Sequence, residues 1–348
     1  PRAARQPTAM APVRIAVLGA GGVGCWVAGR LALAGQKPAL FARGEGLAAL
    51  RAKGLTVLGP DRAELAVLGP DKLTVAQEAA DAGPVDVLVV AVKTHQLAGA
   101  AGLVTEVMNT NKSCLVVPFL NGVGATEDLA ALLAARGVAD AHRRVMGGVA
   151  KCVCYLSAPG VVVFALELSL LLGPVPGAGP EAAEVLARAA AACTIAGIPT
   201  TVSPSPQALQ EALWAKFLIT GVLGPVTALC RAPLDVVMGS EGPREVARRC
   251  MLEMQTVGVA AGVRVPDEAV QDALDAGASA EPGATLSTTR DVLAGRPSEA
   301  RDFCGTVVRL GARHGVPTPA TSLVLWALEP QEARARGEVQ FALDGLGD

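Results

Sequence analysis

The sequence predicts an α/β protein in which an N-terminal, doubly wound parallel sheet is followed by an all-helical C-terminal domain. Two observations indicate this fold class. In the first half of the 348-residue chain, short apolar runs rich in β-branched residues alternate with helical stretches. In the second half, long helical stretches follow one another without a strand-like run. Alternation of the first kind is typical of parallel strands that are covered by helices on both faces.

Four buried strands are predicted in the first half, because each apolar run is continuous rather than alternating. They are expected at residues 13–19, 38–42, 85–92 and 113–120. A helix is expected at 25–34, after a glycine-rich loop. An amphipathic helix that ends on a C-cap glycine is expected at 125–137.

Helices dominate the sequence after a Ser-Pro-Ser-Pro stretch at 203–206, which we take as the domain boundary. We therefore expect a nucleotide-binding domain at 11–203 and a helical substrate domain at 204–348. Residues 1–10, which end on a methionine, are interpreted as a leader or an expression remnant. The helices of the second domain are expected at 207–229, 243–261, 266–276, 285–294 and 298–314.

Composition excludes several classes of function. Hydrophobic residues make up 51% of the chain, enough to offset the entropy of folding, so the chain is not a disordered one. Only 3% is aromatic and 30 basic residues face 32 acidic ones, which argues against nucleic acid or an anionic membrane as a partner. The longest apolar run, at 160–175, is interrupted by Glu167 and Gly173 and is too short to span a bilayer.

The eight cysteines indicate a reducing compartment rather than a disulfide framework. Most are isolated in the sequence, and the one close pair, Cys152 and Cys154, has neither the spacing of a zinc site nor a nearby histidine. We therefore expect no metal and a cytoplasmic location, with the cysteines serving as small core residues.

The glycine-rich loop has the pattern of a dinucleotide-binding fingerprint, Gly19-x-Gly21-x-x-Gly24, between a strand and a helix. In a Rossmann-type domain these glycines allow a tight turn and a close approach of the backbone to a pyrophosphate. Gly22 and Val23 belong to the same loop, and the helix that follows offers free N–H groups, which favour phosphate. A purely structural turn is the alternative reading.

Arg43 follows the second predicted strand, where NAD-specific proteins usually carry an acidic residue. A guanidinium there suits a ribose 2′-phosphate, so NADP(H) is predicted as the cofactor. A solvated surface arginine is the alternative.

Two lysines stand among apolar neighbours in a chain that has only seven. Lys93 ends the third predicted strand, at the edge of the sheet where ligands bind in such folds. Lys216 lies on a stripe with two leucines in a helix that is apolar nearly all round. Burial would lower the pKa of its ammonium towards a range useful for acid–base chemistry. A lysine that extends its ammonium to solvent is the alternative, and periodicity alone does not separate the two.

Taken together, these motifs resemble the ketopantoate reductase (2-dehydropantoate 2-reductase) family over residues 13–319. The resemblance implies a Rossmann domain and a helical domain, with reduction of a 2-keto acid by NADPH in the cleft between them. Ketopantoate, whose reduction to pantoate belongs to pantothenate and coenzyme A biosynthesis, is the implied substrate. The matching segments, in chain order, are IAVLGAGGVG, VAVKTHQ, FLNGVG, LWAKF, STTRDVLAGRPSE and RLGARHGVPTP.

The resemblance also implies the role of each site residue. Lys216 matches the catalytic lysine, which would protonate the carbonyl oxygen as hydride arrives at the carbon. Asn121 matches an asparagine between cofactor and substrate, and Glu299 an acid that holds the substrate hydroxyl. Ser287 matches a serine that contacts the substrate. The matches to cofactor contacts are Lys93 and Arg43.

Read without the resemblance, these residues have simpler explanations. Asn121 precedes a glycine and suits a turn. Ser298 reads as a helix N-cap, so Glu299 would be a first-turn carboxylate favoured by the helix dipole. Ser287 would be a surface hydroxyl.

The sequence departs from the family where asparagines often stand one and two turns after the catalytic lysine. Here the residues are Thr220, which can still form a hydrogen bond with substrate, and Gly224, which has no side chain. The exact substrate therefore stays open. A reductase or dehydrogenase for another hydroxy or keto acid and a non-catalytic NADP-binding protein are the competing readings, and the oligomeric state, with a homodimer considered, is undetermined.

Overall fold

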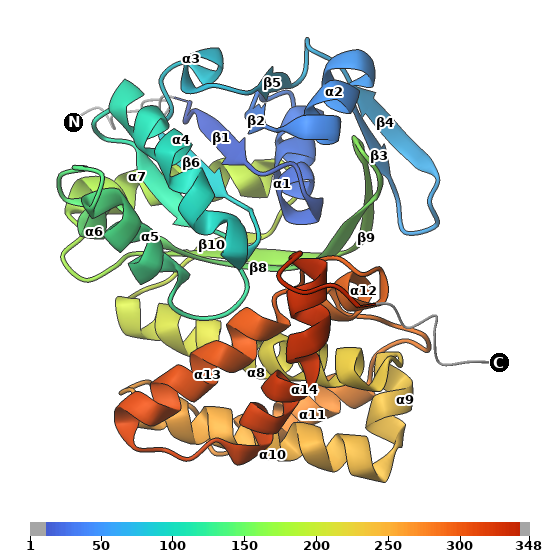
Figure 1. Ribbon diagram of the computed structural model, residues 1–348. Coiled ribbons are helices and arrows are strands. Elements are labelled where there is room, and N and C mark those ends of the chain that lie inside the picture. The colour runs from blue at the N-terminus through green and yellow to red at the C-terminus, as the bar shows by residue number, and fades with distance from the viewer. Residues whose placement is uncertain (1–11, 342–348) are drawn as a thin grey trace, which may run out of the picture. The chain divides into compact units, whose positions relative to one another are not determined.

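The computed structural model describes residues 12–341, and the expectation for residues 1–10 lies outside this range. The chain divides into two compact units (Figure 1). The first unit comprises the residues up to Leu120 together with Gly124–Leu209. The second unit begins at Gln210 and also includes the short segment Asn121–Val123, which lies far earlier in the sequence.

The first unit contains a parallel sheet of five strands in the order β5-β2-β1-β6-β7. Four of these strands fall within the predicted runs and are shorter at both ends, whereas β5 was not predicted. The departure from sequence order at β1 is the topological switch typical of doubly wound folds. The strands are β1 Ile15–Leu18, β2 Ala39–Phe41, β5 Thr74–Ala76, β6 Val87–Val90 and β7 Leu115–Pro118.

Two separate apolar cores cover the two faces of this sheet, because successive residues of a strand point to opposite faces. Val17 and Val89 pack in one core with Trp26 of helix α1. Leu88 packs in the other core with Leu129 of helix α5. The continuous apolar runs in the sequence reflect this double coverage. The helices of the unit are α1 Gly22–Leu33, α2 Gly44–Lys53, α3 Ala79–Ala82, η1 Thr94–Gln96, α4 Leu97–Thr110, α5 Ala125–Ala134, α6 Ala141–Arg144 and α7 Pro180–Ile195.

A second, mixed sheet was not predicted from the sequence. Its central strand, β9, contains the apolar run that was considered as a membrane span. Phe164 and Leu170 of β9 are buried in the core that contains helix α1, whereas Leu166 and Leu168, which lie between them on the strand, are exposed. The strands are β3 Leu55–Leu58, β4 Glu64–Leu68, β8 Gly147–Ala158, β9 Val161–Gly173 and β10 Thr200–Val202.

The second unit is helical, as predicted, and no strand occurs in its described residues, which end at 341. Two helices, α9 and α14, were not predicted from the sequence. The helices pack around one apolar core that includes Trp214, Phe217 and Phe303. They are α8 Pro206–Cys230, α9 Leu234–Gly239, α10 Glu241–Ala260, α11 Ala269–Ala278, α12 Ser287–Leu293, α13 Ala300–His314 and α14 Pro319–Ala335.

Helix α8 is long and apolar enough to cross a membrane by length and composition, and two thirds of its most apolar stretch is buried in the protein. A core helix passes the same test. Leu218 and Leu223 on α8 are fully buried, and both belong to the apolar core of the second unit. Lys216 is the one lysine of this helix, and it is half-buried.

Candidate active site

The predicted cofactor residues of the first unit lie at one edge of the parallel sheet. Leu18 pairs with Phe41 of β2 and with Val90 of β6, so these three strands end at the same level. The chain then continues to Gly19 after β1, to Arg43 after β2 and to Lys93 after β6. This carboxyl edge is where ligands bind in open α/β sheets.

Three glycines of the loop are required by packing within the first unit. Gly19 has φ +111°, and a Cβ on it would lie 2.6 Å from the carbonyl oxygen of Ala91. A Cβ on Gly22 would lie 2.1 Å from the carbonyl oxygen of Cys154, and one on Gly24 would lie 1.8 Å from that of Gly19. No side chain fits at these distances, so these positions alone would also agree with the structural-turn reading.

Gly21 differs from the other three glycines. Its φ is −87°, which any residue can adopt, and no atom lies within 4 Å of the position of a Cβ. Neither backbone strain nor internal packing therefore explains a glycine here. The space in front of Gly21 adjoins the N-terminus of α1, which has no side-chain cap and no acidic residue in its first turn. Open space beside uncapped N–H groups fits the pyrophosphate of a dinucleotide.

Arg43 and Lys93 stand at the start of helical segments after β2 and β6. Arg43 is the N-cap residue of α2 and is exposed to solvent. The backbone N–H of Lys93 donates a hydrogen bond to Gln96 Oε1 at 3.2 Å, which closes the turn into η1. Both cations are therefore carried by short, ordered turns at the carboxyl edge of the sheet.

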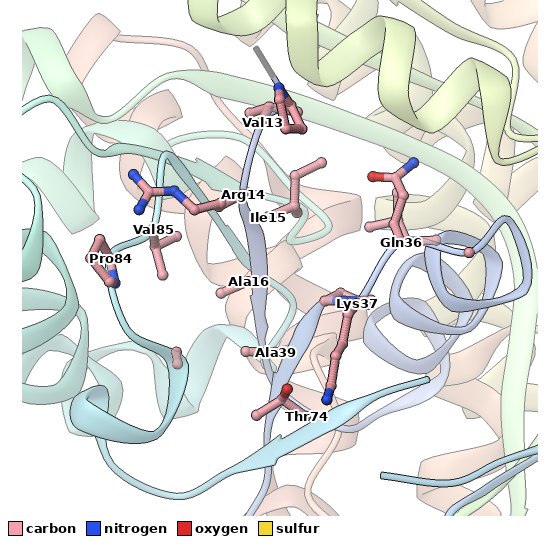
Figure 2. A pocket seen from close by; sticks show the side chains of 15 residues that line it. Val13, Arg14, Ile15, Ala16, Gln36, Lys37, Ala39, Thr74, Pro84 and Val85 are labelled. Carbon is pink, nitrogen blue, oxygen red and sulfur yellow. The ribbon is translucent and has the colours of Figure 1, made fainter. Parts of the chain in front are cut away.

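A hollow of about 460 Å³ lies at the opposite, amino end of the same strands (Figure 2). Its lining includes Arg14, Gln36 and Lys37. The guanidinium of Arg14 pairs with Asp86 at 2.8 Å and holds the pKa of that carboxyl below its usual range. The hollow is thus separated from the glycine loop by the length of the strands, and the predicted cofactor residues do not line it.

The second unit brings together three residues that are far apart in the sequence. Lys216 Nζ donates a hydrogen bond to Asn121 Oδ1 at 2.7 Å across a separation of 95 residues. Asn121 Nδ2 lies 3.4 Å from Glu299 Oε2, to which it donates across 178 residues. The amide of Asn121 is therefore held between an ammonium on its oxygen side and a carboxylate on its nitrogen side, which defines its orientation.

Aromatic packing positions the segments that contain Lys216 and Asn121. Phe217, the residue after Lys216, packs edge to face against Phe303 of α13, with ring centroids 5.8 Å apart. Gly122, the residue after Asn121, has φ +91°, and a Cβ on it would lie 3.6 Å from the Phe303 ring. The left-handed turn at Gly122 directs the chain over these rings, and Asn121 is thereby held beside α8 and α13.

Glu299 lies immediately before α13 and is only 2% exposed. Its carbonyl oxygen accepts a hydrogen bond from Phe303 N at 2.9 Å, the first bond of that helix. One turn further on, burial raises the pKa of Asp302, and the Glu299 and Glu332 carboxylates add to this effect, whereas Arg336 opposes it. The acidic start of α13 is therefore a desolvated environment and not a solvated helix end.

The remaining predicted substrate residues do not join the hydrogen-bonded group. The hydroxyl of Thr220 donates to the carbonyl oxygen of Lys216 at 3.1 Å, within helix α8. Ser287 is the first residue of α12, and no hydrogen bond connects it with Lys216, Asn121 or Glu299 in the part of the chain that the structure describes.

Gly224 has a structural explanation that the sequence did not reveal. A Cβ at this position would lie 2.9 Å from Thr288 Oγ1 and 3.1 Å from Thr288 Cβ. Helix α12 thus packs closely on α8 at this point, and Thr288 takes the space that a side chain at 224 would need. One turn further on, the hydroxyls of Thr227 and Thr289 form a buried hydrogen bond of 2.6 Å.

Two buried residues near Glu299 were missed as site residues. Ser298 was interpreted only as a cap, and its Oγ does accept a hydrogen bond from Ala300 N at 3.1 Å. The same Oγ donates to Glu332 of α14, which is 1% exposed and was not singled out. The sequence did not identify Glu332, because it lies in a helix that was not predicted and that contains Pro330.

Lysine is distributed unevenly in the chain, and Lys216 is the only lysine in residues 152–348. Every other side chain with a permanent positive charge in this region is an arginine, whose pKa is too high for proton transfer. Lys216 is thus the one lysine of the helical unit.

Cysteines and acidic residues form no metal site in residues 12–341, where no group of three or more His, Cys, Asp or Glu side chains is arranged to hold an ion. Within residues 12–341 none of the eight cysteines forms a disulfide bond. Five of them are buried, and burial raises the pKa of the Cys25 thiol to about 12. The core role predicted for the cysteines is thus confirmed for those five, whereas Cys230 is exposed and Cys152 and Cys154 are half-buried.

Comparison with protein families gives two matches that follow each other along the chain. The family described as "Ketopantoate reductase PanE/ApbA" matches residues 15–177. The family described as "Ketopantoate reductase PanE/ApbA C terminal" matches residues 208–332. The two matches cover the parallel sheet with its glycine loop and the helices that carry Lys216 and Glu299.

A 2-dehydropantoate 2-reductase of Mesorhizobium japonicum is 29% identical over 340 residues, which is 93% of this chain and 99% of that protein. Among solved structures, a PanE/ApbA family ketopantoate reductase from Ralstonia eutropha JMP134 is 27% identical, with a TM-score of 0.78 over 93% of this chain and 100% of the other.

The fold is also found in a D-mandelate dehydrogenase solved with NADH and anilino(oxo)acetate, which is 19% identical with a TM-score of 0.77 over 93% of this chain and 99% of the other. At this identity the likeness concerns the fold alone. The two family matches, the relative that matches over 93% of this chain and the arrangement of sheet and helices agree with one another. The chain belongs to the ketopantoate reductase family and is an oxidoreductase.

Proposed function

We propose that this protein reduces a small 2-keto acid with NADPH, and that its substrate is ketopantoate (2-dehydropantoate), which it converts to pantoate. The observation that carries the proposal is the hydrogen-bonded group Lys216–Asn121–Glu299, in which one proton donor is held beside a buried carboxylate. The name of the Mesorhizobium japonicum relative, which covers nearly the whole chain, supports the choice of substrate.

The first unit would hold the cofactor. The open space at Gly21 and the uncapped N-terminus of α1 suit the pyrophosphate, and the guanidinium of Arg43 suits a 2′-phosphate on the ribose. This residue type is our reason for preferring NADPH to NADH. Lys93, on the next strand end of the same edge, is proposed as a further cofactor contact. The bound dinucleotide would supply the hydride.

Lys216 would act as the acid of the reaction. When hydride adds to the carbonyl carbon, the carbonyl oxygen becomes an alkoxide, and a proton from Lys216 Nζ converts it to the hydroxyl of the product. The same ammonium stabilises the negative charge while it develops. Lys216 then regains its proton from water. The hydrogen bond to Asn121 Oδ1 takes one of the three Nζ protons and thereby orients the Nζ.

Asn121 and Glu299 would orient the substrate. The carboxylate of Glu299 can accept a hydrogen bond from a substrate hydroxyl, and its burial strengthens that bond because water does not compete. Ketopantoate carries such a hydroxyl in addition to its keto and carboxylate groups. Thr220 and Ser287 are proposed as further substrate contacts that form when substrate binds.

A second candidate function is reduction of another keto acid by the same chemistry. It is favoured by one observation, the close approach of Thr288 to Gly224, which leaves no polar side chain two turns after Lys216. A protein that binds NADP without catalysis is a third candidate, and the retention of both Lys216 and Glu299 argues against it. We place the proposed enzyme in the cytoplasm and in the synthesis of pantothenate and coenzyme A.

The test is an assay of NADPH oxidation with ketopantoate and with a panel of 2-keto acids of similar size, repeated with NADH. We expect the highest kcat/KM with ketopantoate and NADPH. Turnover of another acid, with none of ketopantoate, would promote the second candidate. Binding of NADPH without turnover of any acid in the panel would promote the third.

A further inference from the structure

Ser298 and Glu299 are adjacent in the chain, and their side chains have different partners. Glu299 Oε2 accepts the hydrogen bond from Asn121 in the proposed active site. Ser298 is fully buried and is bound to the last helix, α14. A residue that holds Ser298 therefore also determines where the backbone of Glu299 lies.

Glu332 on α14 holds Ser298 at two atoms. Its Oε1 accepts a hydrogen bond from Ser298 Oγ at 2.5 Å, and its Oε2 accepts one from Ser298 N at 3.3 Å. Arg336 completes the group, because its Nη2 donates to Glu332 Oε2 at 3.2 Å and to the Ser298 carbonyl oxygen at 3.0 Å. The hydroxyl, the N–H and the carbonyl of Ser298 are thus all bound by two residues of the C-terminal part of the chain.

The burial of this group is more than helix packing alone requires. A carboxylate that is 1% exposed is costly unless it is paired and fully hydrogen-bonded, and Glu332 meets both conditions. A leucine would pack α14 on α13 without that cost. What a leucine could not do is hold a serine backbone in one position, and that serine is followed directly by the carboxylate of the proposed site.

We infer that Glu332 is a positioning residue, which holds Ser298 and thereby places the Glu299 carboxylate for the substrate hydroxyl. This inference rests on the proposed function, in which Glu299 binds that hydroxyl. Glu332 itself touches neither Lys216 nor Asn121 through any hydrogen bond in the described chain, so its effect passes through the backbone of the turn that leads into α13.

Glu253 provides a matched control on the same helix. Its carboxylate, on α10, accepts hydrogen bonds from Ala320 N at 2.7 Å and from Thr321 N at 2.8 Å, at the opposite end of α14. Glu253→Ala therefore also removes a carboxylate that anchors α14, without touching the segment that contains Glu299. Both alanine variants should lower the melting temperature.

The experiment compares selectivity for the substrate hydroxyl in Glu332→Ala, Glu332→Gln, Glu253→Ala and Glu299→Gln. For each, kcat/KM is measured with ketopantoate and with α-ketoisovalerate, which lacks the hydroxymethyl group. We expect Glu299→Gln and Glu332→Ala each to reduce the ratio of the two values by about tenfold, mainly through KM for ketopantoate, which is the effect of weakening one charge-assisted hydrogen bond. Glu332→Gln keeps an acceptor for Ser298 Oγ and should restore most of the ratio.

A lower melting temperature of Glu332→Ala with an unchanged ratio would overturn the inference, and so would an equal loss of selectivity in Glu253→Ala. If the wild-type protein does not reduce ketopantoate, the proposed function fails, and the inference is then decided by hydrogen exchange. Amides 298–302 should exchange faster in Glu332→Ala than in Glu253→Ala, and equal exchange in the two variants would contradict a positioning role.

Discussion

The two units build their sites in opposite ways. In the first unit, each proposed cofactor residue stands a few positions after a strand of one parallel sheet, so the site follows from where β1, β2 and β6 end. In the second unit, Asn121, Lys216 and Glu299 come from three distant segments and meet through two hydrogen bonds that span 95 and 178 residues. A strand end is a local feature of sequence, whereas convergence of helices depends on packing.

This difference affects how each site should respond to substitution. The glycine loop is formed largely by backbone atoms, so only a change that adds atoms in the wrong place disturbs it. The helical site is formed by individual side chains, so the loss of one functional group removes its chemistry. Three experiments test this comparison, beginning with the largest expected effect.

Lys216→Ala should lower kcat by about a thousandfold, because it removes both the proton donor and the charge that stabilises the alkoxide. The dissociation constant for NADPH, measured by its fluorescence, should stay within about twofold of the wild-type value, since the cofactor residues belong to the other unit. Steady-state assays with saturating NADPH provide kcat.

Lys216→Arg is the matched control for this change. Arginine keeps the positive charge, yet its pKa is too high for it to serve as a proton donor near neutral pH. We expect KM for the keto acid to be nearly retained while kcat falls. A kcat close to the wild-type value in either variant would contradict the proposal that Lys216 is the proton donor.

Gly21→Ala and Gly24→Ala should separate ligand binding from packing in the glycine loop. A methyl group at Gly21 meets only open space, so the free energy of unfolding should fall by no more than about 1 kcal/mol, the cost of alanine at an N-cap. Affinity for NADPH should nevertheless fall at least about tenfold, because the methyl group occupies the approach of the pyrophosphate.

Gly24→Ala is expected to affect mainly the stability of the fold, since its methyl group would clash with the carbonyl oxygen of Gly19. Urea denaturation should show a loss of about 2 kcal/mol or more. Unchanged NADPH affinity in Gly21→Ala would indicate that the loop is a purely structural turn.

Arg43→Ala tests the proposed preference for NADPH over NADH. It should weaken NADPH binding by about five- to tenfold, the value of one exposed ion pair with a phosphate, and leave NADH binding unchanged. Arg51→Ala is the control, because Arg51 lies in the last turn of the same helix, α2, and is also exposed. Equal losses in the two variants would mean that Arg43 adds only to the overall charge.

Prediction from the sequence was most successful where the signal is local. The fold class is confirmed, and the glycine loop stands between a strand and a helix, as expected. The second sheet was missed because the run that forms β9 is nearly all apolar, and such a run does not indicate its partners. Strands β3 and β4 of the same sheet were missed as well, since a strand of four or five residues leaves little pattern in a sequence.

For the helical unit, the sequence identified Lys216 as unusual but did not separate a buried lysine from one that reaches solvent. In the structure Lys216 is half-buried, and its Nζ donates a hydrogen bond to Asn121 Oδ1. Glu299 was open to reading as a first-turn carboxylate, and its 2% exposure argues against a purely solvated helix end. Gly224 was seen as a missing side chain, whereas packing against Thr288 gives it a structural reason.

The sequence by itself therefore determined the fold class, the glycine loop and the rarity of lysine near Lys216. These features depend on neighbouring residues, whose backbone preferences and apolar periodicity can be read along the chain. Only the tertiary structure decided that Asn121 belongs with the helical unit, and that a buried glutamate on α14 holds the serine beside Glu299. Those relations depend on which surfaces pack together, and packing joins residues whose separation in sequence carries no information about their contact.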